Sequence, residues 1–160
     1  MNIKPTFREA QRGDCALILD FIKGIARYEK LEDKVVATVE LLEEWIFEKQ
    51  SAWVIFPVVD SKEVGFAVFC QNFSTFMGRA GMYLEDIYIM PEYRGQGIGK
   101  QLIEFSIEAA RGYGKKYLRL YTSTDPNEAA AQFLYEKYGF RVFRVERKYW
   151  GALLYRERVL

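Results

Sequence analysis

The sequence of 160 residues contains no histidine and only two cysteines. Without histidine, the chain cannot build a Ser-His-Asp or Cys-His catalytic arrangement, and it lacks the usual nitrogen ligand for zinc. Cys15 and Cys70 lie far apart with no CxxC pair, so we expect two buried thiols and neither a disulfide framework nor a metal site. Acid–base chemistry therefore falls to carboxylates, tyrosines, lysines or water.

The sequence also lacks an excess of one charge and any long apolar run. Its 23 basic and 22 acidic residues give a formal net charge of +1, so we expect no nucleic-acid partner. No apolar run approaches the roughly 18 residues that a membrane-spanning helix needs, and residues 1–12 contain no apolar signal segment. These absences predict a cytoplasmic protein without a membrane partner.

The residues that are present are typical of a globular protein. Half of them are hydrophobic, with twelve Phe and eleven Tyr spread along the chain, and the length fits one domain over residues 1–160. The hydrophobic patterns predict the order β-α-α-β-β-β-α-β-α-β-β, which is a mixed α/β layer with a central sheet of about seven strands and about four helices.

The boundaries of these elements follow from turn residues and periodicity. Four helices are expected: one after Asp14 that ends in the charged segment 27–34, one from Thr38 to about Lys49, one from Ile98 to Gly112, and one over 127–138 that closes at Gly139. The expected strands cover 3–9, 51–59, 64–72, 82–90, 116–122, 140–147 and 149–156.

Residues 93–100 read YRGQGIGK and lie between a predicted strand and a predicted helix. Glycines leave backbone N–H groups unhindered at a helix N-terminus, where they can hold an anion, although a plain glycine turn is the alternative. A Walker loop would need glycine in place of Arg94 and serine or threonine in place of Gln101, and a Rossmann loop would need glycine in place of Lys100. The pattern that remains is Arg-x-x-Gly-x-Gly, formed by Arg94, Gly97 and Gly99.

Two carboxylates, Glu85 and Asp86, lie inside the apolar strand that precedes this loop. Adjacent strand residues point to opposite faces of a sheet, so at least one carboxylate faces the covered side. Its burial costs free energy unless it is paired or functional. An internal ion pair and a catalytic role are therefore both open from the residues alone.

The Arg-x-x-Gly-x-Gly pattern, the strand and loop YLEDIYIMPEYRGQGIGK and the late segment FLYEKYGF occur here in the order typical of the Gcn5-related N-acetyltransferase (GNAT) superfamily, which the chain resembles over nearly its whole length. Within it, residues 25–38 and 83–99 are similar to the spermidine/spermine, or diamine, acetyltransferase branch. The C-terminal third departs from that branch by one additional residue between Asn127 and Tyr135, which leaves the acceptor open.

The resemblance implies acetyl-CoA as the donor and no metal. It implies that the backbone of the strand pairs with the pantetheine arm, that the loop holds the pyrophosphate, that Asn127 or Glu128 touches the arm, and that Tyr135 protonates the leaving sulfur. A tyrosine that merely packs on the sheet is the alternative for Tyr135. The expected coenzyme-binding residues are Ile87, Tyr88, Ile89, Arg94, Gly95, Gln96, Gly97, Ile98, Gly99, Lys100, Asn127 and Tyr135.

For the acceptor, the resemblance implies that Glu85 draws a proton from the amine, directly or through water, and that Asp86 lies beside the amine. Tyr28 and Glu29 match the acceptor-binding segment of the diamine branch, although such a charged run is also typical of a solvated face. We therefore expect an acetyltransferase for a di- or polyamine, acting by direct attack in a homodimer. The alternatives are another amine (an amino acid, a lysine analogue, an aminoglycoside or a protein N-terminus) and a non-catalytic CoA-binding module.

Overall fold

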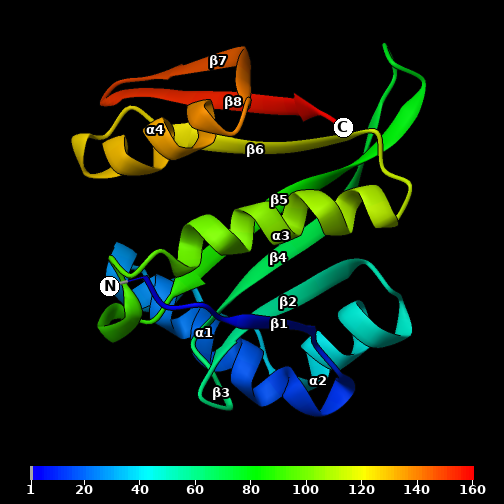
Figure 1. Ribbon diagram of the computed structural model, residues 1–160, viewed down its shortest axis with the longest axis vertical. Helices are drawn as coiled ribbons and strands as arrows, with labels where there is room; N and C mark the ends of the chain where they lie inside the picture. Colours follow the sequence, from blue (N-terminus) through cyan, green and yellow to red (C-terminus); the bar gives the residue numbers. More distant parts are fainter. Residues whose placement is uncertain (1) are drawn as a thin grey trace. The chain divides into compact units, whose positions relative to one another are not determined.

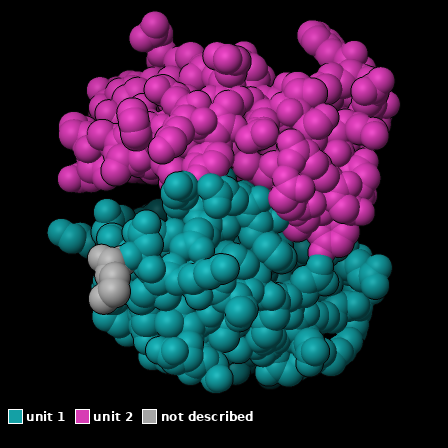
Figure 2. All heavy atoms as spheres, in the orientation of Figure 1, with its two compact units in different colours: residues 1–70, 85–106 teal, residues 71–84, 107–160 magenta. Residues whose placement is uncertain are grey.

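A computed structural model describes residues 2–160 and contains one eight-stranded sheet with the strand order β1-β2-β4-β5-β6-β8-β7, in which β3 pairs with β2 (Figure 1). The chain divides into two compact units, residues 1–70 with 85–106 and residues 71–84 with 107–160 (Figure 2), and each is described by itself. The strands are β1 (Thr6–Glu9), β2 (Ala52–Val59), β3 (Lys62–Glu63), β4 (Gly65–Ser74), β5 (Arg79–Ile89), β6 (Tyr117–Ser123), β7 (Arg141–Lys148) and β8 (Gly151–Val159).

Four α-helices occur within residues 2–160: α1 (Cys15–Glu29), α2 (Val39–Leu42), α3 (Ile98–Gly112) and α4 (Ala129–Lys137). The mixed α/β architecture predicted from the sequence is therefore confirmed. The additional strand is β3, whose two residues are too few to show a hydrophobic alternation. None of the helices in the described part of the chain combines the length and apolar character needed to cross a bilayer.

In unit 1, helix α1 covers one face of strands β2 and β4. Its buried Ile18 and Phe21 form a core cluster with Val54, Phe56 and Phe66. Because side chains alternate along a strand, Val59 of β2 faces the other side, where it packs with Val64 and with Ile98 of α3. This layered core fixes the start of α3, and with it the glycine-rich loop that precedes the helix.

Two predicted boundaries in unit 1 are wrong. Strand β1 begins at Thr6 and not at residue 3, because the N–H of Ile3 donates to Gln96 O (3.1 Å). Thr38 caps the second helix as predicted, accepting from Leu41 N at 3.2 Å, but the helix changes to a π-helix, η3, over Glu43–Glu48. Cys15 is buried as predicted, whereas Cys70 is partly exposed.

In unit 2, strand β8 pairs antiparallel with both β6 and β7, and β6 pairs in parallel with β5 at Met82 and Tyr83. Arg156 of β8 is only 2% exposed, and its guanidinium bonds to Thr122 Oγ1 (3.1 Å) and Glu136 (3.3 Å). The predicted helix over 127–138 is a short turn, η5 (Pro126–Glu128), followed by α4. It closes at Gly139 with φ 81°, as predicted.

Candidate active site

The glycine-rich loop follows β5 and the turn η4 (Pro91–Tyr93) and leads into α3. Gly95 (φ 72°) and Gly97 (φ 79°) adopt the left-handed conformation that favours glycine. Within residues 2–160, no backbone N–H from Gly95 to Lys100 donates to a protein acceptor. The loop thus presents consecutive donors at the positive end of α3, an arrangement suited to a phosphate group.

The carbonyl groups of the loop are engaged on its inner side. Gln96 O accepts from Ile3 N, while Gln101 Nε2 donates to Ile3 O (2.7 Å) and Gly97 O (3.2 Å). A Cβ atom at Gly97 would lie 3.1 Å from Asn2 Oδ1. Residues 2 and 3 therefore act as a strap that fixes the orientation of the loop.

Strand β5 is held against β4 just before the loop. A Cβ atom at Gly65 would lie 2.1 Å from Tyr88 O, and Met90 N donates to Val64 O at 2.9 Å. Only glycine at position 65 permits this approach of the two backbones. Ile87, Tyr88 and Ile89, whose backbones are expected to pair with the pantetheine arm, are all partly buried at this end of β5.

Arg94 stands at the start of the loop and is held by three contacts. Its Nε donates to Ile89 O at 2.8 Å, and its guanidinium carbon lies 5.2 Å from the ring centroid of Tyr28 and 5.5 Å from that of Tyr88. Tyr28, which the sequence places with the acceptor residues, is thus brought to an arginine of the loop. Both aromatic faces attract the cation.

The two adjacent carboxylates of β5 differ in environment. Glu85 is exposed and Asp86 is partly buried, in agreement with the alternation of a strand. Burial raises the pKa of Asp86 to about 6, and the negative charges of Glu85 and Glu29 add to the effect. Neither carboxylate makes an ion pair with any residue between 2 and 160, so the internal ion pair is not observed.

Asp86 faces a pocket of about 380 Å³ in unit 1. Its walls are apolar side chains of α1 and of residues 31–37, together with three charged residues, Glu29, Lys34 and Asp86. The segment 31–37 is fastened to α1 by the bond from Leu31 N to Ala26 O (2.8 Å). Within the described chain, neither Tyr28 nor Glu85 lines this pocket. An alkyl chain fits such walls, and an ammonium group fits the carboxylate end.

The remaining predicted site residues lie in unit 2. Tyr135 of α4 is 6% exposed, its ring packs edge-on against Phe140 (5.7 Å between centroids), and burial, followed by the charge of Glu128, raises its pKa to about 12. Asn127 is exposed, whereas the carboxylate of Glu128 accepts from Ser123 N at 3.0 Å. Of these two candidates for contact with the pantetheine arm, Asn127 is the one whose side chain makes no such bond within residues 2–160.

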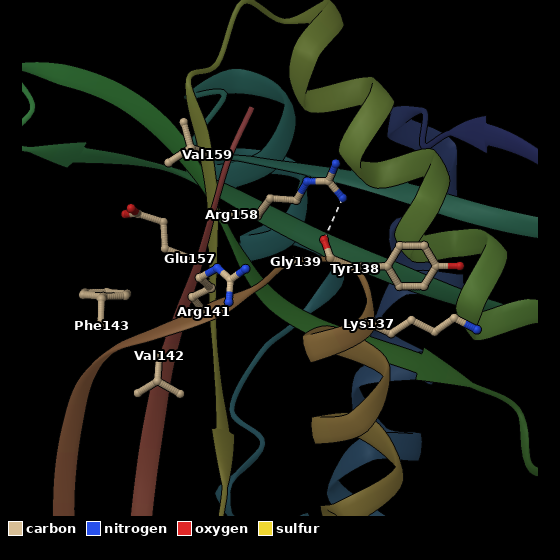
Figure 3. Close-up of a pocket in the computed structure, with 9 residues that line it drawn as sticks. All are labelled: Lys137, Tyr138, Gly139, Arg141, Val142, Phe143, Glu157, Arg158 and Val159. Atoms are coloured by element: carbon tan, nitrogen blue, oxygen red, sulfur yellow. Dashed lines mark hydrogen bonds between the residues drawn. The ribbon is translucent and has the colours of Figure 1, made fainter.

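A second pocket, of about 600 Å³, lies in unit 2 between the end of α4 and strands β7 and β8 (Figure 3). Its charged side chains do not converge: Glu157 and Lys137 point in opposite directions, and Arg158 Nη1 donates to Tyr138 O at 2.7 Å. Glu157 also pairs with Arg119 at 2.6 Å. No predicted site residue lines this pocket.

Sequence reasoning missed Lys34 as a wall of the first pocket and the contact between Tyr28 and Arg94. The charged segment 27–34 was the available signal, but it does not show which charge faces inward. No group of three or more acidic or thiol side chains within residues 2–160 is placed to hold a metal ion.

Comparisons with known proteins indicate the family of the chain. The Acetyltransferase (GNAT) family profile matches residues 19–140. Thialysine N-ε-acetyltransferase of Bos taurus is 37% identical over 156 residues, which cover 87% of this chain and 91% of that protein. Spermidine/spermine N(1)-acetyltransferase-like protein 1 of Homo sapiens is 30% identical over 105 residues, 61% of this chain and 15% of that much longer protein.

Among solved structures, the putative acetyltransferase yncA of Salmonella typhimurium, in complex with acetyl-CoA, has a TM-score of 0.77 at 22% identity and covers 99% of this chain and 95% of its own. At this identity, the structural similarity shows the fold of the chain. The match to the family profile shows the type of reaction. The chain therefore belongs to the acetyltransferase (GNAT) family and is an acetyl-CoA-dependent N-acetyltransferase.

Proposed function

We propose that this enzyme acetylates a terminal amine of a small di- or polyamine. The supporting observation is the pocket of unit 1, which is lined by apolar side chains suited to methylene groups and by the acidic residues Asp86 and Glu29. The second carboxylate suits a second ammonium group. The pocket volume of about 380 Å³ is that of a small-molecule site.

On the donor side, the proposal gives the loop from Arg94 to Lys100 the pyrophosphate of acetyl-CoA. Its consecutive N–H groups and the guanidinium of Arg94 supply donors for the phosphate oxygens. The backbone of Ile87–Ile89 pairs with the amide groups of the pantetheine arm, and the exposed Asn127 contacts that arm.

The acceptor amine has an ordinary pKa of about 10.4 and must lose a proton before it attacks. In our proposal, Asp86 holds the ammonium group in the pocket and Glu85 accepts its proton. Because Glu85 faces the other side of β5, the proton reaches it through water and not by direct contact. The neutral nitrogen then attacks the thioester carbonyl and gives its second proton to water as the tetrahedral adduct collapses. The C–S bond breaks with its electron pair on sulfur, and no covalent enzyme intermediate forms.

Tyr135 is proposed to act at the sulfur atom. A phenol with a pKa of about 12 stays protonated at neutral pH. Full transfer of its proton to a thiolate, whose thiol has an ordinary pKa of about 8.5, is uphill by about 5 kcal/mol. Tyr135 therefore stabilises the departing sulfur by donating a hydrogen bond, and solvent supplies the proton if one is needed.

A second candidate acceptor is a diamino acid. Lys34 also lines the pocket, and its ammonium group would repel the far end of a polyamine but attract a carboxylate. Among residues 2–160, Lys34 pairs only with the adjacent Asp33, at 3.3 Å, and both side chains are 73% exposed, so a substrate carboxylate can replace that contact at little cost. The relatives named for thialysine agree with this candidate.

A thiol-release assay with acetyl-CoA separates the two candidates. The panel contains putrescine and spermidine as polyamines, and ornithine, lysine and thialysine as diamino acids. A higher kcat/KM for the polyamines supports the first candidate. Preference for the diamino acids supports the second, and Lys34→Gln should then lower kcat/KM for the diamino acids alone. Turnover of neither class would contradict the proposed acceptor.

We also propose that the enzyme is a homodimer that uses the surface of β7 and β8. Seven of the eight residues of β7 are exposed, and Val142, Phe143, Val145 and Trp150 expose between 43% and 49% of their surface. Such an apolar surface is typical of an interface. Light scattering after gel filtration measures the mass directly, and a monomer at micromolar concentration would contradict this proposal.

The cytoplasmic location of the enzyme stays a prediction from the sequence.

A further inference from the structure

Arg94 is an exposed cation whose position is nevertheless fixed. Its Nε is bonded to Ile89 O, and the aromatic rings of Tyr28 and Tyr88 lie 5.2 Å and 5.5 Å from its guanidinium carbon. Within residues 2–160, no carboxylate forms an ion pair with Arg94. Its positive charge therefore remains available to an anionic ligand, and no hydrogen bond joins its Nη groups to the described part of the chain.

The two tyrosines are anchored differently. Tyr88 packs against Phe21 and Phe66 of the core, with ring centroids at 5.8 Å and 6.4 Å. Its hydroxyl lies so close to Gly24 of α1 that a Cβ atom there would approach it to 2.6 Å. Tyr28, in the last turn of α1, is 65% exposed. Removing the ring of Tyr28 therefore changes the support of Arg94 without opening the core.

Free arginine side chains lose rotamer freedom when they bind an anion, and a side chain already held in place loses less. An aromatic ring is well suited to this task because it attracts the guanidinium without neutralising its charge, as a carboxylate would. The position of Tyr28 thus favours the donor site, whereas the sequence pattern placed it with the acceptor.

We propose that Tyr28 is a positioning residue for the coenzyme: it holds the guanidinium of Arg94 ready to bind the pyrophosphate of acetyl-CoA. This inference rests on the proposed role of the loop in binding that group. It assigns Tyr28 to the binding site of the acetyl donor, and it leaves binding of the acceptor amine to Asp86 and Glu29.

The test compares Tyr28→Leu with Tyr28→Phe, which keeps the aromatic face. Tyr28→Leu should raise the KM for acetyl-CoA about two- to five-fold, the effect of one exposed cation–π contact, while Tyr28→Phe stays near the wild type. Phe76→Leu, which removes a fully exposed aromatic ring of the β4–β5 turn, is the matched control and should change nothing.

Acetyl-pantetheine, a thioester donor without the pyrophosphate, isolates the contact. Its kcat/KM should be the same for Tyr28→Leu and the wild type, and the KM for the amine should not change. In an Arg94→Gln background, Tyr28→Leu should have no further effect. An equal loss with acetyl-pantetheine, a change confined to the amine KM, or an undiminished effect without Arg94 would each overturn the inference.

Calorimetric titration with CoA keeps the inference separate from the proposed function. The Kd for CoA measures the support of Arg94 without any turnover, so it can be determined even if no amine in the panel is acetylated. A wild-type protein that binds CoA but acetylates nothing contradicts the proposed function only. A Tyr28→Leu variant that binds CoA as tightly as the wild type contradicts the role of Tyr28.

Discussion

Asp86→Asn removes a carboxylate whose pKa is raised by burial from the ordinary 3.8 to about 6. The folded protein thus binds this proton more tightly than the unfolded chain does. Ionisation of Asp86 consequently costs folding free energy, and the cost grows as the pH rises through the window from 3.8 to about 6 and is complete above it. The difference between the two pKa values corresponds to about 3 kcal/mol, which we reduce to about 2 kcal/mol because solvent reaches part of the side chain.

The asparagine variant should therefore be more stable than the wild type by about 2 kcal/mol at about pH 7.5, and by about a third of that at about pH 4.5. Urea denaturation followed by tryptophan fluorescence measures both values. The same variant should lose at least about tenfold in kcat/KM for the amine, because the ammonium group loses its partner. A side chain that lowers stability while it serves the substrate is typical of an active site.

Asp20→Asn is the matched control, because Asp20 is an exposed carboxylate on α1. Its effect on stability should stay within about 0.5 kcal/mol at both pH values. Asp86→Asn could instead destabilise the protein, or raise its free energy of unfolding equally at both pH values. Either result would show that ionisation of this carboxylate does not lower the stability of the folded protein, and the reasoning would be refuted.

Three further predictions follow from single contacts. Tyr135→Phe should lower kcat about a hundredfold with the Kd for CoA unchanged, and a variant with normal kcat would remove the phenol from the reaction. Gly24→Ala should displace the ring of Tyr88, whose hydroxyl would lie 2.6 Å from the new Cβ, and cost about 1–3 kcal/mol in urea denaturation; unchanged stability would show that the ring moves aside freely. Thr122→Val should cost about 1–3 kcal/mol because the buried Arg156 loses the acceptor of its Nε at 3.1 Å, and the prediction fails if the unfolding midpoint stays in place.

The sequence predicts the architecture well where short-range rules decide it. Thr38 caps its helix and Gly139 ends another with φ 81°, since a hydroxyl acceptor and a missing Cβ act locally. The errors arise where distant groups compete for the backbone. Ile3 is bonded to residues 96 and 101 and not to a strand, and no periodicity in the first ten residues could indicate this.

The candidate site was predictable in its residue types more than in its contacts. A strand carboxylate and a glycine loop can be read from the chain, and Asp86 does line a pocket. Their partners depend on the path of the chain at the end of α1, which brings Tyr28 to Arg94 and places Lys34 in the pocket wall. The pKa of about 12 for Tyr135 likewise depends on tertiary burial and cannot be inferred from the helix pattern.

The strap formed by residues 2 and 3 and the close approach at Gly65 have a consequence for engineering. They hold the glycine-rich loop through contacts that do not involve the pocket wall of residues 31–37. A mutant library confined to that wall can therefore explore new acceptors while the affinity for the coenzyme is preserved. Tyr28, three residues before the wall begins, marks where such a library should stop.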